Sequence, residues 1–246
     1  MQLNSTKILG ISITTSPKGV ILEYIIKYLD EPVKKEQKPL IIVTPNPEQI
    51  VLAQKNMEFK ELLNRADVAL PDGIGVSIAA HVSRIPGVEF MEDLVKVAAK
   101  QGDTIGLIGG TKGLAVKALD CLRQKHTGLQ GWAVEPEALE LQEIVQKIRK
   151  TNTRIVFVGL GAPKQEEYIA RLAHESQKSK VKSHIVFMSV GGSFDIISGR
   201  LKRAPVLMRS IGFEWLWRLI QEPWRWRRQL ALVKFIWLVL KEKLGV

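Results

Sequence analysis

The sequence predicts an α/β fold in which a mostly parallel sheet carries helices on both faces. Two features lead to this prediction. Short runs rich in Val, Ile and Leu alternate with segments of helical periodicity along residues 1–199, and strands that are apolar on both faces are typical of parallel sheets buried between helices. At 246 residues, 46% of them hydrophobic, the chain can also enclose a substantial core.

The apolar runs are expected to be the strands, because each is short, rich in large apolar residues and bounded by Gly, Pro or polar turn residues. The expected strands are residues 7–13, 39–44, 68–70, 104–110, 129–134, 154–161 and 184–192. The segments between them repeat apolar residues at helical spacing. The expected helices are residues 17–30, 47–56, 60–66, 74–80, 90–100, 112–125, 138–150 and 164–176.

Positive charge and tryptophan are concentrated near the C-terminus. Residues 200–246 contain 11 Lys and Arg against 3 Glu, which accounts for +8 of the net charge of +11, and they hold five of the six tryptophans. We therefore expect two parts, an α/β domain at residues 1–199 and a basic, Trp-rich helical appendage at residues 200–246.

The appendage is open to three interpretations. Its apolar run 229–240 has 12 residues, whereas a bilayer span needs about 20, so the favoured interpretation is an amphipathic segment on an anionic membrane surface. One alternative is a C-terminal helix packed on the core, with its arginines extended into solvent. The other is a nucleic-acid surface, which is disfavoured because the appendage has no recognisable reading motif, and we expect no nucleic-acid partner.

Ligands of parallel α/β sheets bind beyond the carboxyl ends of the strands, where this sequence places small, amide, hydroxyl and acidic residues. These residues are Thr44, Asn46, Asp72, Gly109, Gly110, Glu135, Gly159, Gly161, Gln165, Gly192 and Asp195. Glycines at helix N-termini let backbone amides approach phosphate groups, although turn geometry explains them equally well. The set suits a phosphorylated, sugar-like ligand, and the missing P-loop motif excludes a P-loop ATPase.

Asp72 stands in a Pro-Asp-Gly corner between a short strand and a small-residue helix. One interpretation is a turn residue or helix N-cap. The other is a general base that takes the proton of an acceptor hydroxyl, a role that contributes about 10²–10⁴-fold to a rate. A diphosphate bound nearby needs charged hydrogen-bond donors, for which Arg84 and the arginines of the appendage are the candidates.

The sequence offers no recognisable metal or cofactor site. Its four histidines are scattered, Cys121 is the single cysteine, and neither a His-x-x-x-His motif nor a Cys pair is present. We expect no metal, no cofactor and no disulfide, and the cysteine content favours a cytosolic location.

Five ordered motifs resemble those of one protein family. They are VTPNPEQIVLAQKNMEFKELLNRADVALPDGIGV, RIPGVEF, GLGAPKQEEYI, VGGSFDIISGRLKRAP and GFEWLWRLIQEPWRWRRQ, and together they resemble the WecG/TagA/CpsF family of bacterial glycosyltransferases over residues 8–228. The resemblance implies a Rossmann-like sheet and a metal-independent, inverting transferase. It also implies a UDP-sugar donor, typically UDP-N-acetylmannosamine, and an undecaprenyl-diphosphate-linked N-acetylglucosamine acceptor, as in teichoic acid synthesis.

The resemblance implies roles for individual residues as well. Asp72 of the PDG motif is the implied catalytic base. The implied substrate-binding residues are Thr44, Asn46, Arg84, Gln165, Gly192, Asp195, Arg218, Arg225 and Arg228. The glycine-turn argument adds Gly109 and Gly110 to this set. One departure is Glu89, which stands where many members carry Asp and leaves the donor or acceptor subgroup open.

Several alternatives remain open at this point. The donor sugar is N-acetylmannosamine in the favoured interpretation, with N-acetylmannosaminuronate, glucose or galactose as alternatives. Other classes of protein are a non-catalytic module that binds UDP-sugars at a membrane surface and an NAD-dependent oxidoreductase. The appendage is expected to hold the protein peripherally at the inner face of the cell membrane, and pairing of its apolar surface would give a homo-oligomer.

Overall fold

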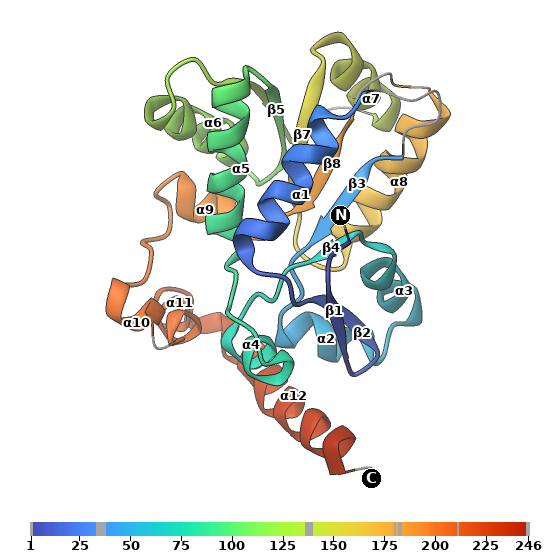
Figure 1. The fold of residues 1–246 in the computed structure, drawn as a ribbon. Helices are drawn as coiled ribbons and strands as arrows, with labels where there is room; N and C mark the ends of the chain where they lie inside the picture. The colour runs from blue at the N-terminus through green and yellow to red at the C-terminus, as the bar shows by residue number, and fades with distance from the viewer. Residues whose placement is uncertain are drawn as a thin grey trace.

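The computed structural model describes residues 2–32, 38–135, 140–179, 181, 184–210 and 212–244. It confirms the predicted fold class, because six strands form one sheet in the order β4-β3-β8-β7-β5-β6 with helices on both faces (Figure 1). Every neighbouring pair of strands in this sheet is parallel. The carboxyl ends of all six strands therefore lie on the same side of the molecule.

The strands from residue 39 onward, and the helices up to residue 178, fall where the periodicity predicts them, whereas the short helix at residues 193–197 was not expected. The strands of the sheet are β3 (Leu40–Val43), β4 (Val68–Ala69), β5 (Thr104–Gly109), β6 (Gln130–Val134), β7 (Thr153–Gly159) and β8 (Val186–Ser189). The helices that flank them are α1 (Lys18–Asp30), α2 (Pro47–Ala53), α3 (Met57–Arg65), α4 (Ile74–Ala80), α5 (Gly87–Gln101), α6 (Leu114–Lys125), α7 (Leu141–Lys150), α8 (Lys164–Lys178) and α9 (Ser193–Ile197). The helix expected at 138–150 is confirmed from Leu141 onward, since residues 136–139 lie outside the described residues.

The first expected strand, residues 7–13, is wrong as a single strand of the sheet. This part of the chain forms a separate antiparallel hairpin of β1 (Ser5–Ile8) and β2 (Ile11–Thr14). Leu9 and Gly10 have φ angles of 51° and 74°, the left-handed conformation that a tight hairpin turn requires. The apolar run therefore reverses direction at its centre.

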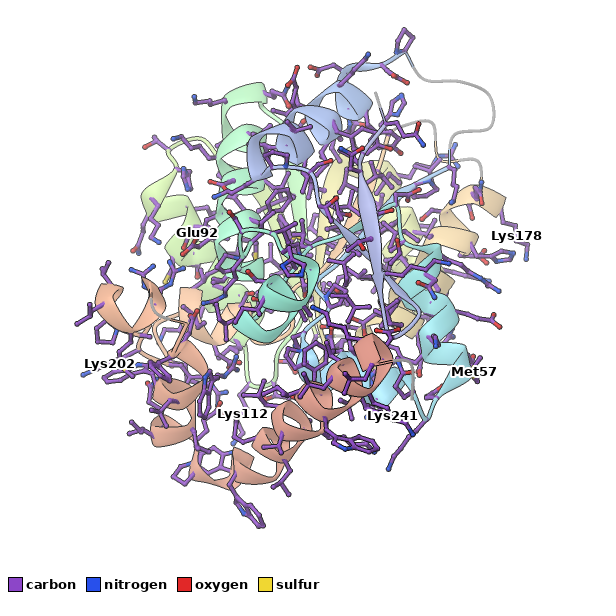
Figure 2. The ribbon with its side chains drawn as sticks, turned by 60° about the horizontal axis from the view of Figure 1, so that its bottom comes forward. Met57, Glu92, Lys112, Lys178, Lys202 and Lys241 are labelled. Carbon is purple, nitrogen blue, oxygen red and sulfur yellow. The ribbon has the colours of Figure 1, made fainter. Side chains whose placement is uncertain are left out.

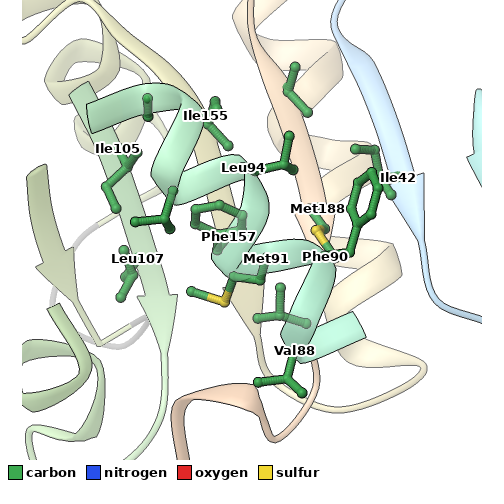
Figure 3. Packing of buried hydrophobic residues seen from close by; sticks show 14 of the residues in the cluster. Ile42, Val88, Phe90, Met91, Leu94, Ile105, Leu107, Ile155, Phe157 and Met188 are labelled. Carbon is green, nitrogen blue, oxygen red and sulfur yellow. The ribbon is translucent and has the colours of Figure 1, made fainter. Parts of the chain in front are cut away.

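One face of the sheet packs against α1, α5, α6 and α9. Figure 3 shows how α5 supplies much of this layer, with Phe90, Met91 and Leu94 lying over strand residues such as Phe157. All four side chains are fully buried, and burying a large apolar side chain contributes about 1.5–3 kcal/mol. The packing of α5 also fixes the end of the loop that leads into it, close to Arg84.

Two further apolar clusters complete the core. The opposite face of the sheet packs against α7 and α8, and strand residues of the other parity, such as Val156 and Phe187, point toward these helices. The β1–β2 hairpin packs with α2, α3 and α4 beside the strands β3 and β4.

The chain ends in a helical segment that crosses the side of the molecule where the strands end (Figures 1 and 2). This C-terminal segment consists of α10 (Val206–Ser210), α11 (Glu214–Gln221), the 3-10 turn η2 (Pro223–Arg225) and α12 (Trp226–Leu244). The predicted helical appendage is thus confirmed, while the domain boundary at residue 200 stays a prediction.

Helix α12 packs against α2 and α4. Phe235 is buried in this contact, whereas large apolar side chains on other faces of α12, such as Trp237, are exposed. Among the residues that the structure describes, no helix is both long enough and apolar enough to cross a membrane.

Candidate active site

A cavity of about 520 Å³ lies at the carboxyl ends of β3, β4, β7 and β8 and is bordered by α11 and α12. This volume is within the range of about 300–1,000 Å³ typical of ligand pockets. Ten residues that the sequence singled out line it, namely Thr44, Asn46, Asp72, Arg84, Gly159, Gly161, Gln165, Gly192, Asp195 and Arg218. The strand order brings them together, because β8, the last strand in sequence, inserts between β3 and β7.

Asp72 lies on the cavity wall, at the corner between β4 and α4, with its side chain 29% exposed. Helix α4 begins after Gly73 and no side chain caps it, so the interpretation of Asp72 as a helix cap is not supported. Removal from solvent raises the pKa of Asp72 to about 6, against the lowering effect of the nearby Arg84 guanidinium. Such a carboxylate is ionised at neutral pH and is a stronger base than an ordinary aspartate, which favours general base catalysis.

Thr44 and Asn46 lie just beyond the end of β3. The Thr44 hydroxyl donates to the carbonyl of Ser189 on the neighbouring strand β8, at 3.4 Å. Asn46 Oδ1 accepts from the backbone N–H of Gln49 at 3.0 Å and caps α2. Because only the oxygen of the Asn46 amide is used by the cap, its NH₂ group is available to a ligand hydroxyl or carbonyl.

Gln165 is buried at the start of α8 and is held at both ends of its amide. Its Oε1 accepts from the backbone N–H of Gly191 at 3.0 Å, and its Nε2 donates to Glu166 Oε1 at 2.8 Å. These bonds fix the Gln165 side chain against the loop that follows β8. Burial raises the pKa of Glu166 to about 7. The sequence did not identify Glu166 as a residue of the site, although it directly follows the predicted Gln165.

Arg218 of α11 lies against the backbone of Gly192. A Cβ at Gly192 would collide with Arg218 Nη2, so glycine is what allows the guanidinium to approach this loop. Arg218 also forms ion pairs with Glu222, at 3.1 Å, and with Asp195, at 3.9 Å. Arg218 of the C-terminal segment and Asp195, which follows β8, were both predicted at the site, and the fold brings them together at the cavity.

Gly109 and Gly110 do not line this cavity. Their φ angles are 125° and 70°. A Cβ at Gly109 would collide with the carbonyl oxygen of Gly159 on β7, and a Cβ at Gly110 with the Cβ of Leu114, so close packing accounts for these glycines. At the same end of the sheet, Glu135 accepts from the backbone N–H of Gly113 at 2.6 Å, just before α6. A part for the two glycines in substrate binding stays a prediction.

Two of the predicted arginines are placed by the backbone alone. Arg225 and Arg228 lie in η2 and in the first turn of α12, but their side chains lie outside the described residues.

Within the described part of the chain, no cluster of three or more His, Cys, Asp or Glu side chains is arranged to hold a metal ion. A metal-independent reaction stays a prediction.

The structure adds acidic partners that the sequence did not identify. Glu214, the first residue of α11, forms a close ion pair with Arg84. Glu89, the departure from the family pattern, accepts from Arg203 at 2.5 Å and Arg209 at 3.3 Å. Glu89 therefore joins α5 to the C-terminal segment. Glu214 belongs to the last of the five motifs, but nothing local to that motif indicates a partner 130 residues away.

The parallel sheet carries a cavity at its carboxyl edge, lined by a carboxylate and arginines, which is where enzymes with this class of fold bind their ligands. The chain belongs to the glycosyl transferase WecG/TagA/CpsF family, which it matches over residues 6–246, and it is a glycosyltransferase. It is similar to the N-acetylglucosaminyldiphosphoundecaprenol N-acetyl-beta-D-mannosaminyltransferase of Bacillus subtilis (strain 168). The two sequences are 33% identical over 225 residues, which cover 89% of this chain and 86% of the relative. The resemblance carried by the five motifs is confirmed.

Proposed function

We propose that this protein transfers N-acetylmannosamine from UDP-N-acetylmannosamine to undecaprenyl-diphosphate-linked N-acetylglucosamine, in the synthesis of a teichoic acid-like polymer. The observation that carries the proposal is Asp72, a carboxylate with a pKa of about 6 on the wall of a cavity of about 520 Å³. The activity for which the Bacillus subtilis relative is named supports the choice of sugar and acceptor.

Asp72 is the proposed general base. Its carboxylate accepts the proton of an acceptor hydroxyl while the oxygen of that hydroxyl forms a bond to the anomeric carbon of the donor. The bond between this carbon and the UDP oxygen breaks on the opposite face of the sugar, and UDP leaves with the electron pair. The configuration at the anomeric carbon is therefore inverted.

The departing diphosphate is proposed to be stabilised by arginines. Arg84 and Arg218 both line the cavity, and guanidinium groups form strong, charge-assisted hydrogen bonds to phosphate oxygens. Arg225 and Arg228 are included on the family resemblance. Positive charge placed where negative charge develops lowers the barrier of the transfer step, so the proposal requires no metal ion.

The C-terminal segment is proposed to hold the protein against the anionic inner face of the cell membrane, where a polyprenyl-linked acceptor would be embedded. The support is an exposed apolar surface on α12, whose members are Leu230, Val233, Ile236, Trp237 and Leu240. The net charge of +8 in residues 200–246 adds attraction of about 1 kcal/mol for each basic residue near such a surface.

The test is a transfer assay with the full-length protein, a polyprenyl-diphosphate N-acetylglucosamine acceptor and a panel of UDP-sugars, without added metal. Asp72→Asn should fold normally and lose about 10²–10⁴-fold in turnover, because the amide cannot accept the proton. Asp120→Asn is the matched control, since Asp120 is exposed on α6, and it should keep normal turnover.

Three results of this assay would contradict parts of the proposal. Normal turnover of Asp72→Asn would exclude Asp72 as the base. Transfer of glucose, galactose or N-acetylmannosaminuronate in place of N-acetylmannosamine would correct the donor. Binding of a UDP-sugar with no transfer from any donor would favour a non-catalytic module.

A further inference from the structure

Glu214 reaches from the C-terminal segment into the wall of the cavity. It begins α11, and its carboxylate accepts a hydrogen bond from Nη2 of Arg84, on the loop between α4 and α5. The approach of α11 is fixed nearby by Gly212, where a Cβ would collide with the side chain of Ile74 on α4. Glu214 is therefore held at the part of the fold that also carries Asp72.

The guanidinium of Arg84 is shared unequally between two carboxylates. Glu214 takes its Nη2 end in a close ion pair, whereas Asp72 Oδ1 lies 3.9 Å from its Nε. At that distance Asp72 and Arg84 are not hydrogen-bonded, and the buried Arg84 Nε has no hydrogen-bond partner among the described residues. Arg84 thus forms its hydrogen bond through Nη2 with Glu214 and forms none with Asp72.

This division matters because a close arginine would weaken Asp72 as a base. An arginine in direct contact lowers the pKa of an aspartate by about 1–3 units, and a carboxylate with a lower pKa accepts a proton less readily. The charged groups acting on Asp72 are Arg84, which lowers its pKa, and Glu214, which raises it. The backbone N–H groups of Gly73 and Gly87 also lower it, and desolvation is the largest influence of all.

We propose that Glu214 is a positioning residue that holds Arg84 out of hydrogen-bonding contact with Asp72 and so keeps Asp72 basic. The inference rests on the proposed role of Asp72 as the proton acceptor. It gives the C-terminal segment a part in the reaction beyond supplying arginines, because Glu214 of α11 helps to raise the pKa of Asp72 at the edge of the sheet.

The test measures the ionisation of Asp72 directly and does not depend on turnover. The full-length protein is labelled with ¹³C at aspartate carboxyl groups and titrated by NMR, and the Asp72 signal is identified as the one missing from Asp72→Asn. In Glu214→Gln the pKa of Asp72 should fall by about one unit, because a like charge is lost and Arg84 is released toward Asp72. Glu242→Gln is the control, since it removes a carboxylate from the same segment that binds the backbone N–H of Leu9 instead.

Positioning through Arg84 is separated from a simple charge effect by a double-mutant cycle. In an Arg84→Met background, Glu214→Gln should shift the pKa of Asp72 by less than half as much as it does in the wild type. An equal shift in both backgrounds, or no fall in Glu214→Gln itself, would overturn the proposal. If Glu214→Gln does not fold, Glu214→Asp, whose shorter side chain retracts from Arg84, should lower the pKa in the same direction, and an unchanged value would again overturn it.

The transfer assay distinguishes this proposal from the proposed function. If Asp72 is the base, the acidic limb of the pH–rate profile should move with the NMR pKa in Glu214→Gln and stay in place in Glu242→Gln. A shift of the NMR pKa without movement of the acidic limb would support the positioning role of Glu214 and reject Asp72 as the proton acceptor.

Discussion

Replacing Phe235 with Ala should release α12 from the fold while the sheet stays intact. Phe235 is 2% exposed and is the one large apolar side chain buried within the described residues 212–244. It joins the cluster formed by the β1–β2 hairpin, α2, α3 and α4. Gly75 of α4 makes room for it, since a Cβ there would lie 3.3 Å from Cε1 of the ring.

The expected loss in the free energy that docks α12 on the fold follows from this burial. Truncation of a buried Phe to Ala costs about 3–5 kcal/mol in protein cores. The contact lies at the edge of the fold, where neighbouring side chains can close part of the space, so we expect a value near 3 kcal/mol. Since each 1.4 kcal/mol changes an equilibrium about tenfold, the population with α12 undocked should rise about 100-fold.

Hydrogen exchange of the α12 amides measures this local opening. Exchange should be about 100-fold faster in Phe235→Ala, with no change in the strands β5, β7 and β8. Trp237→Ala is the matched control, because Trp237 is 58% exposed on the same helix and both variants gain the same helix propensity from Ala. Unchanged exchange in Phe235→Ala, or an equal rise in Trp237→Ala, would refute the reasoning.

Two further predictions concern the cavity. The pKa of Asp72, raised to about 6, means that its carboxyl group is protonated at lower pH, so the transfer rate should fall about tenfold per pH unit below pH 6 and level off above it. A rate that stays constant from pH 4.5 to 7 would contradict its role as a base. Gly192→Ala should lower kcat/KM about 10–100-fold, because the new Cβ displaces the flexible guanidinium of Arg218 and its charged hydrogen bonds are worth about 1.5–3 kcal/mol. The control is Gly19→Ala, where a Cβ has open space, and the same loss in both variants would exclude the Arg218 explanation.

Much of the fold and of the candidate site follows from the sequence alone. Apolar runs and helical periodicity are local patterns, so they identified the strands after residue 39 and the helices up to residue 178, and placed Thr44, Asp72 and Gln165 just beyond strand ends. The rule that ligands bind at the carboxyl ends of parallel strands then predicted the site without knowledge of the strand order. The five motifs identified the family for the same reason, since each is contiguous in sequence.

The remaining features depend on which distant segments pack together. The order β4-β3-β8-β7-β5-β6 groups the ends of β3, β4, β7 and β8 at one cavity and leaves Gly109 and Gly110 outside it. The pairing of Arg84 with Glu214, and the contribution of Glu214 to the raised pKa of Asp72, arise only when α11 docks beside α4. Local propensity determines what each segment becomes, whereas burial and charge pairing between residues far apart in the chain determine which carboxylate is desolvated and which arginine it faces.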